Sequence, residues 1–215
     1  PSVWSPTVSL SGFRAVVAHS VLHKCELRSL DLPSAFVQVD WPAHLPPHYL
    51  KFPENIRDVL TDEFKGKDLK SPVWKMVKMI YGHRLSGWTF CKRLQDILLK
   101  NGFVPCDWCN AVMIHPEKNI CICTYIDDLA FSCDSAGEVF LMQCIRDGGL
   151  KIGDAAECCK KYLGTKLTVI RGERETTVRF DQQEYAVAIC EMYRELYGKM
   201  PNPRKFPGSW NANLT

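Results

Sequence analysis

The chain lacks an apolar run of the roughly 18–20 residues that a membrane-spanning helix needs. It also lacks a strong excess of one charge, because 27 Lys and Arg residues oppose 24 Asp and Glu residues, for a formal net charge of +3. Neither a GxGxxG nor a GxxxxGK[ST] motif occurs, so the usual nucleotide-binding loops are absent. The sequence therefore predicts neither a membrane protein nor a P-loop enzyme. Its charge neither demands nor excludes a nucleic-acid partner.

Residues 1–6 lack the basic and apolar regions of a signal peptide. Cysteine is abundant, with 11 residues, but the number is odd and the spacing irregular. We therefore expect an intracellular, reducing environment and no disulfide framework. The 46% of hydrophobic and 24% of charged residues are proportions of a folded globular protein. The length of 215 residues predicts one large domain or two small ones.

The periodicity of apolar residues predicts both helices and strands. Helices are predicted at residues 9–22, 88–100, 136–146 and 182–197, with a weaker one at 55–64. Strands are predicted at 25–32, 49–53, 73–80, 111–115, 119–126, 129–133, 162–170 and 176–180. Hairpins are expected around residues 116–118 and 171–175. Because the order is not a regular βαβ alternation, the sequence predicts an α+β fold with an antiparallel sheet.

Two adjacent carboxylates, Asp127 and Asp128, lie between two apolar strands and should form the tip of a hairpin. Like charges at the end of buried strands are costly unless a counter-charge compensates them. Divalent cations supply that charge, and Mg²⁺ prefers one or two carboxylates together with substrate phosphates. The alternative interpretation of an Asp-Asp pair is a simple polar turn.

A third carboxylate, Asp31, lies at the end of a short apolar strand between Leu30 and Leu32. Its alternative role is a cap for the turn that follows. Three carboxylates on neighbouring strand ends can hold two Mg²⁺ ions about 3.5–4 Å apart, an arrangement that clamps an in-line phosphoryl displacement. We therefore expect Asp31, Asp127 and Asp128 to be catalytic and metal-binding residues.

Five short segments, in the same order, resemble the reverse transcriptase of copia-type LTR retrotransposons. The resemblance covers about residues 5–200. The segments are residues 125–128 (the Tyr-x-Asp-Asp box), 30–36 (the Asp-Val-x-x-Ala-Phe box), 81–103 (Tyr-Gly … Trp … Leu … Gly-Phe), 162–164 (the Phe-Leu-Gly box) and 180–185 (Leu-x-Gln-x-x-Tyr).

This resemblance implies a reverse-transcriptase palm, an antiparallel sheet backed by helices, with incomplete fingers. Residues 1–160 would form the palm with partial fingers, 161–198 the primer-grip hairpin and the start of the thumb, and 199–215 a linker tail. The implied activity is that of a nucleotidyltransferase, an RNA-directed DNA polymerase that uses two Mg²⁺ ions, with Mn²⁺ as a substitute.

The implied partners are an RNA/DNA template-primer, dNTPs and the rest of a polyprotein, with its fingers segment, RNase H and DNA-integrating integrase. The implied location is a cytoplasmic particle or the nucleus, with no membrane association.

The resemblance also assigns roles outside the acidic triad. Ala35, Phe36 and Tyr125 would contact the dNTP, with Phe36 excluding a ribose 2′-OH and Tyr125 lying against the primer terminus. Leu163 and Gly164 would belong to the primer grip. The alternatives are a core aromatic for Phe36, an ordinary sheet residue for Tyr125 and a β-bulge for Gly164.

The sequence departs from the family pattern in three places. It begins where the palm begins, so we expect the basic fingers segment to be missing. The turn at residues 83–88 is two residues shorter than the copia pattern. We likewise expect the sequence to stop after the start of the thumb, without an RNase H or integrase region. An alternative function is therefore a catalytically inactive, retrotransposon-derived fragment that at most binds nucleic acid. A palm-like nucleotidyl cyclase is disfavoured because Tyr125 and Ile126 replace the two glycines of its turn.

A zinc site is the remaining alternative for metal binding. Cys106 and Cys109 have the spacing of one half of such a site, and His115 lies nearby in the sequence. Cys121 and Cys123, however, have a Cys-x-Cys spacing on a predicted strand, which is not the usual second half. We therefore interpret the cysteines mainly as small core residues.

Overall fold

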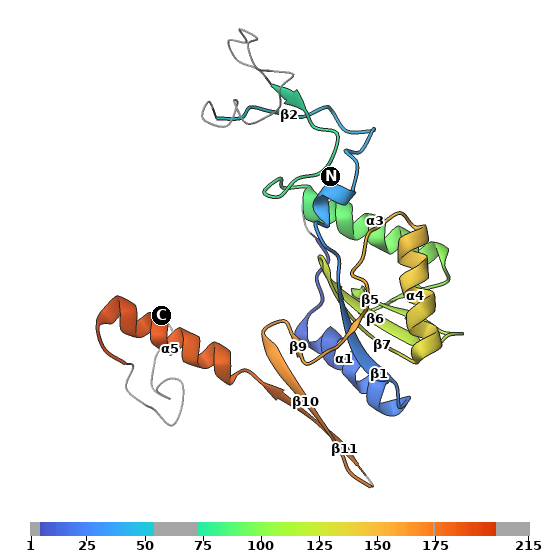
Figure 1. Cartoon of the computed structure of the whole chain (residues 1–215), viewed down its shortest axis with the longest axis vertical. Helices are drawn as coiled ribbons and strands as arrows, with labels where there is room; N and C mark the ends of the chain where they lie inside the picture. Colours follow the sequence, from blue (N-terminus) through green and yellow to red (C-terminus); the bar gives the residue numbers. More distant parts are fainter. Residues whose placement is uncertain (1–4, 54–72, 174, 201–215) are drawn as a thin grey trace. The chain divides into compact units, whose positions relative to one another are not determined.

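The computed structural model describes residues 5–53, 73–173 and 175–200. The chain divides into two compact units, Pro1–Cys159 and Lys160–Thr215, which are coloured from blue to orange-yellow and from orange to red in Figure 1. The division falls next to the boundary predicted after residue 160. The assignment of these units to palm and thumb, and of residues 199–215 to a linker, stays a prediction.

The first unit is built on a six-stranded sheet with strand order β4-β5-β6-β7-β1-β8. Every neighbouring pair in it is antiparallel. The strands are β1 (Glu26–Asp31), β4 (Val104–Cys106), β5 (Cys109–His115), β6 (Ile120–Tyr125), β7 (Asp128–Cys133) and β8 (Glu157–Cys158). Together with the helices, this sheet confirms the predicted α+β class at the level of mixed, antiparallel architecture.

Three α-helices pack on this sheet, namely α1 (Leu10–Leu22), α3 (Ser86–Lys100) and α4 (Ser135–Asp147). A short 3₁₀ helix, η1 (Phe36–Gln38), follows β1. Helices α3 and α4 contact each other, and α1 contacts β1, β5, β6 and β7 (Figure 1). The main hydrophobic core includes Leu129 and Phe131 of β7 with Leu94, Ile97, Leu98, Leu141 and Ile145 of α3 and α4.

The alternation of side chains along β7 places its two faces in different surroundings. Phe131 packs in the core with α3 and α4, whereas the next residue, Ser132, has its Oγ 3.0 Å from His19 Nδ1 of α1. Helix α1 therefore lies across the sheet from α3 and α4. Asp128 lies four positions before Ser132, so it belongs to the face that α1 partly covers.

Local sequence patterns predicted several of these elements correctly. Helix α1 lies within the predicted range 9–22, and Ser9 caps its N-terminus, because Ser9 Oγ accepts a hydrogen bond from Gly12 N at 3.1 Å. Helix α3 begins at Ser86, two residues before its predicted start, and ends before Gly102, whose φ is +86°. Strands β5 and β6 form the hairpin expected around residues 116–118.

Other expectations were wrong in extent. The strand predicted at 73–80 is limited to β3 (Trp74–Lys75), which pairs with β2 (Tyr49–Leu50). Residues 76–79 instead form isolated backbone hydrogen bonds to the irregular segment before β2. Met76 N donates to His48 O, and Met79 N donates to Val39 O. No continuous ladder can form against such a partner. Strand β4 was missed, and the helix predicted at 55–64 lies outside the described residues.

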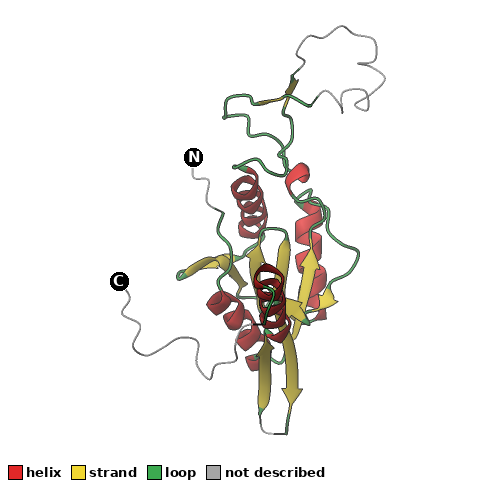
Figure 2. Ribbon diagram, turned by 90° about the vertical axis from the view of Figure 1, so that its left-hand side faces the viewer, coloured by secondary structure: helices red, strands yellow, loops and turns green. Residues whose placement is uncertain are grey.

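The second unit contains a hairpin followed by a helix. Strands β10 (Thr165–Arg171) and β11 (Thr176–Asp181) pair along their length, β9 (Lys161–Tyr162) joins β10, and α5 spans Gln183–Tyr197 (Figure 2). The strand predicted at 162–170 is interrupted because Leu163 and Gly164 form the two-residue turn between β9 and β10. The bulge considered for Gly164 is therefore wrong.

Candidate active site

Asp127 lies in a tight turn at the tip of the β6–β7 hairpin. Tyr125 and Asp128 are paired across the ladder, so only Ile126 and Asp127 connect the strands. Ile126 has a φ of +58°, which is unusual for a β-branched residue and costs of order 1–3 kcal/mol. Its side chain packs against the main core, which supports this conformation. The turn therefore presents Asp127 and Asp128 in fixed backbone positions.

Asp31 lies directly opposite Asp128 in the β1–β7 ladder. Side chains at such directly opposed positions point to the same face of the sheet, with Cβ atoms about 4.5–5.5 Å apart. Leu32 N also donates a hydrogen bond to Asp127 O at 3.0 Å, and this bond fixes the end of β1 to the hairpin turn. The backbone thus brings the three predicted carboxylate residues to one end of the sheet.

The three carboxylates act on one another electrostatically. Burial raises the pKa of Asp128 above its ordinary value, and the negative charges of Asp127 and Asp31 raise it further. The charge of Asp127 also reaches α3, where burial first and Asp127 second raise the pKa of the Cys91 thiol to about 11. The site therefore concentrates negative charge, and a cation would relieve the repulsion.

The donor chemistry of this site fits a hard divalent cation, since all three side chains offer carboxylate oxygens. Over residues 5–53, 73–173 and 175–200, however, no three His, Cys, Asp or Glu side chains are grouped closely enough to hold a metal ion. Mg²⁺ commonly takes only one or two protein carboxylates and completes its shell with phosphate oxygens and water. The carboxylates at the sheet end are thus suited to share a cation with a bound phosphate.

The cysteines of the zinc alternative have a different environment. Cys121 and Cys123 are buried in β6, and burial raises the pKa of Cys121 to about 12. Among the described residues, no three His, Cys, Asp or Glu side chains are grouped closely enough to hold a metal ion. Cys106 and Cys109 face each other at the irregular end of the β4–β5 ladder. This part of the chain therefore offers no support for zinc binding.

Phe36 lies where the core meets the surface, close to the Asp31 turn. It is half-buried, and its ring centroid is 4.7 Å from that of Tyr81 and 6.3 Å, edge-on, from that of Phe90. Ala35 is fully buried and belongs to the main hydrophobic core, and its predicted contact with the dNTP stays a prediction. The sequence did not predict the contact between Phe36 and Tyr81, although Tyr81 belongs to the Tyr-Gly pair of the family resemblance. Phe36 and Tyr81 together form a small aromatic surface.

Tyr125 and the two primer-grip candidates lie in other surroundings. Tyr125 is the last residue of β6 and is 40% exposed, so its ring is open to a ligand. Leu163 and Gly164 form the β9–β10 turn of the second unit, with φ values of +48° and +70°. A side chain at Gly164 would meet no atom within 4 Å, so the positive φ, not crowding, favours glycine there.

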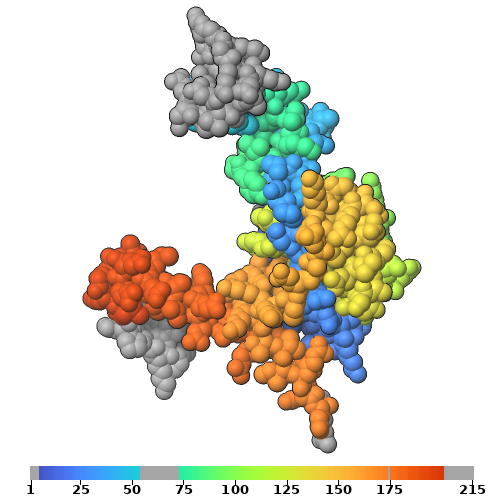
Figure 3. Space-filling view, viewed as in Figure 1, coloured from blue at the N-terminus to red at the C-terminus, as the bar shows by residue number. Residues whose placement is uncertain are grey.

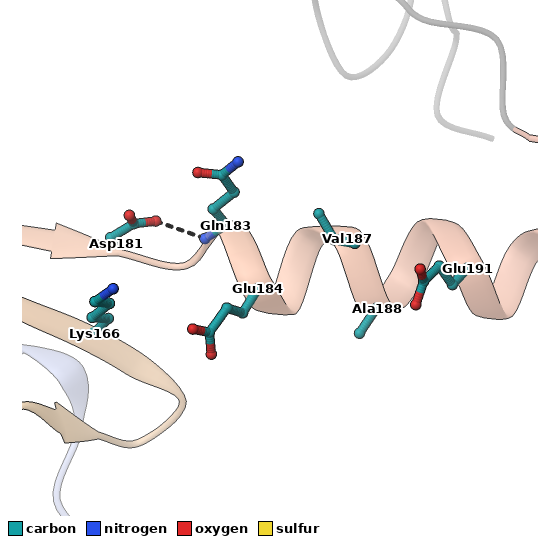
Figure 4. A pocket seen from close by; sticks show the side chains of 7 residues that line it. All are labelled: Lys166, Asp181, Gln183, Glu184, Val187, Ala188 and Glu191. Atoms are coloured by element: carbon teal, nitrogen blue, oxygen red, sulfur yellow. Dashed lines mark hydrogen bonds between the residues drawn. The ribbon is translucent and has the colours of Figure 1, made fainter.

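The second unit also contains a cavity of about 390 Å³ between the ends of β10 and β11 and the start of α5 (Figure 4). Asp181, Glu184 and Glu191 line it together with Lys166, and Lys161 Nζ pairs with Glu184 Oε2 at 2.9 Å. Gln183 N donates a hydrogen bond to Asp181 Oδ1 at 2.8 Å at its edge (Figure 4). This excess of carboxylates does not suit a phosphate backbone, so we do not place nucleic acid in this cavity.

None of the helices in the described ranges is both long and apolar enough to cross a membrane. The fold and the site together define a mixed α+β protein whose carboxylates converge at one end of an antiparallel sheet. The family comparison makes the class specific, because residues 1–200 match the family described as reverse transcriptase (RNA-dependent DNA polymerase). The chain belongs to this family, in its copia-type branch. A search among curated proteins finds no significant match.

Proposed function

We propose that this chain is the RNA-directed DNA polymerase domain of a copia-type retrotransposon polyprotein, and that it adds dNTPs to a primer 3′-OH. The observation that carries the proposal is the register of the β1–β7 ladder, which sets Asp31 opposite Asp128 beside the Asp127 turn. Without that register, the family motifs would not converge on one chemical centre.

Asp31, Asp127 and Asp128 would hold two Mg²⁺ ions, with Mn²⁺ as a substitute. When bound, these ions lower the pKa of the attacking hydroxyl and neutralise the developing charge on the phosphates. The protein contributes by holding three carboxylates on backbone fixed by strand pairing and by the strained Ile126 turn. Such a rigid arrangement avoids reorganisation when the substrate binds.

Phe36 would lie beneath the sugar of the incoming dNTP and exclude a ribose 2′-OH. Its edge-on contact with the fully buried Phe90 and its contact with Tyr81 restrict how far the ring can move aside. Tyr125, being exposed at the end of β6, would lie against the primer terminus. Leu163 and Gly164 would contact the primer strand from the second unit. The fingers segment, RNase H and integrase would be further parts of the same polyprotein.

Primer extension on an RNA template tests this proposal. Asp127→Asn should abolish dNTP incorporation in Mg²⁺ and in Mn²⁺, whereas Asp107→Asn, which changes an exposed carboxylate in the β4–β5 connection, should retain it. Phe36→Val should increase the incorporation of ribonucleotides relative to dNTPs. If the unsubstituted chain and Asp127→Asn are equally inactive with both metals, the alternative holds, namely an inactive fragment that at most binds nucleic acid.

A further inference from the structure

Two histidines from separate segments of the first unit are hydrogen-bonded to each other. His48 lies in the irregular segment between η1 and β2, and His83 lies in the turn before α3. His48 Nδ1 is 3.1 Å from His83 Nε2. In the space-filling view, the light-blue residues after η1 lie against the green residues before α3 (Figure 3). The histidine pair therefore joins two neighbouring segments through residues that are 35 positions apart in the chain.

The hydrogen-bond partners of His83 assign the proton that the pair shares. Leu85 N donates to His83 Nδ1 at 3.3 Å, so Nδ1 accepts and carries no proton in the neutral ring. The proton of neutral His83 is therefore on Nε2, which donates it to His48 Nδ1. Both rings are neutral in this arrangement, and each nitrogen in the two bonds has one fixed role.

A second proton on either ring removes one of these bonds. Protonated His48 carries an N–H group at Nδ1, which faces the N–H group at Nε2 of His83. Protonated His83 carries an N–H group at Nδ1, which faces the N–H group of Leu85. If His83 moves its proton to Nδ1 in order to accept from protonated His48, it loses the bond to Leu85 as well. Both bonds are therefore present only when both imidazoles are neutral.

The surroundings of His83 also disfavour its charged form. Burial lowers the pKa of His83 below its ordinary value of 6.5, and the positive charges of protonated His48 and of Arg84 lower it further. Trp41 packs against both imidazoles, with ring centroids 4.7 Å from His48 and 5.3 Å from His83. Because the unfolded chain takes up the proton first, the neutral pair stabilises the folded state above about pH 6.5, and this effect is lost as the pH falls further.

A backbone hydrogen bond next to the pair joins the same two segments. Met76 N donates to His48 O at 2.8 Å, so the Met76 amide reports whether His48 stays in place. The ion pair between Lys78 and Asp40 also joins the segments, but its side chains are 47% and 81% exposed, and such surface pairs contribute little. Opening of the histidine pair should therefore expose the Met76 amide to solvent.

We propose that His48 and His83 form a pH-sensitive latch, which is closed at neutral pH and opens when either imidazole is protonated. Opening releases residues 39–49 from the turn before α3. The same turn holds Tyr81, whose ring contacts Phe36. The latch therefore connects pH to the aromatic surface beside the candidate active site, and its opening does not depend on the proposed polymerase function.

The test is hydrogen exchange of the Met76 amide in the complete 215-residue chain, measured by NMR at about pH 7.5 and about pH 5. Its protection factor, which removes the intrinsic effect of pH on exchange, should fall about fivefold at the lower pH, because one net hydrogen bond is lost. His83→Gln should keep the same protection at both pH values, since its side-chain amide takes up no proton and can either donate to neutral His48 or accept from protonated His48. His44→Ala, which removes an exposed histidine of the same segment, should respond to pH as the unsubstituted chain does.

The nitrogen chemical shifts of the imidazole rings provide a second measurement that needs no substitution. At about pH 7.5, His83 should carry its proton on Nε2 and not on Nδ1. Circular dichroism checks that each variant is folded. The proposal is overturned if His83 carries its proton on Nδ1 at this pH, or if the protection factor of Met76 is equal at both pH values. It is also overturned if folded His83→Gln responds to pH as strongly as the unsubstituted chain.

Discussion

Asp128→Asn should stabilise the protein at neutral pH. The substitution preserves the size of the side chain but removes one of three neighbouring negative charges. Burial, Asp127 and Asp31 together raise the pKa of Asp128 above its ordinary value of 3.8. The ionised carboxylate is therefore disfavoured in the folded state relative to the unfolded chain.

The size of the effect follows from the strand pairing. Like charges directly opposite each other on neighbouring strands destabilise a sheet by roughly 0.2–1 kcal/mol. Because Asp31 and Asp128 occupy such positions, we expect Asp128→Asn to raise the free energy of unfolding by about 0.5 kcal/mol. For a protein of this size, that corresponds to a rise in Tm of about 1–2 °C.

The difference should depend on pH with a defined sign. The folded state retains the Asp128 proton to a higher pH than the unfolded chain does, so its stability falls as pH rises from 3.8 through the raised folded-state pKa. The advantage of Asn should therefore be complete once the pH lies above the raised folded-state pKa, and it should nearly vanish at about pH 3, where Asp128 is largely protonated in both the folded and the unfolded state.

Urea unfolding at about pH 7 and at about pH 3, monitored by circular dichroism, measures the free energy of unfolding of both proteins and its dependence on pH. Asp107→Asn is the matched control, since Asp107 is exposed between β4 and β5. It should change the free energy of unfolding by less than about 0.3 kcal/mol at either pH. A destabilised Asp128→Asn variant, or a difference from the unsubstituted chain that is the same at both pH values, would refute the electrostatic account of this site.

Two further predictions concern the thiols and the second unit. Iodoacetamide at about pH 8 should alkylate the exposed Cys158 and spare Cys121 and Cys133. Burial raises the pKa values of the two buried thiols to about 12, so that well under one in a thousand of them is a thiolate at this pH. Peptide mass spectrometry identifies the labelled cysteines, and early labelling of Cys121 would contradict the prediction. Leu163→Asn should stabilise the β9–β10 turn by about 1 kcal/mol, because Asn tolerates the positive φ of this position better than Leu and precedes Gly164 in a favoured Asn-Gly turn. Amide exchange in β10 should then slow by about fivefold, whereas unchanged exchange would show that the turn is not strained.

Elements with strong local patterns could be predicted from the sequence. Helix α1 has its serine cap and apolar spacing, and the β5–β6 hairpin has two β-prone runs around a short polar turn. The turn at Leu163 could not be predicted in the same way, because leucine carries no turn signal. Strand β3 was overestimated because an apolar run does not reveal whether its partner is a regular strand.

The convergence of the site depended on information that is not local. Asp127 and Asp128 are adjacent in the sequence, and their hairpin was evident from its flanks. The pairing of Asp31 with Asp128 joins residues 97 positions apart, and a shift of one position would place Asp31 on the other face of the sheet. The same limit applies to the contact between Phe36 and Tyr81 and to the hydrogen bond between His48 and His83, which only the folded backbone brings together.

The claim that the three carboxylates share divalent cations is tested most directly by titrating Mn²⁺ into the complete chain. The electron paramagnetic resonance signal of free Mn²⁺ measures how much of the ion is bound. We predict that Asp31→Asn and Asp128→Asn each weaken Mn²⁺ binding by about tenfold, since affinity follows the number of charged ligands, and that Asp107→Asn leaves it unchanged. Mn²⁺ binding by Asp31→Asn that equals that of the unsubstituted chain would contradict a shared site, whatever the effect of changing Asp128.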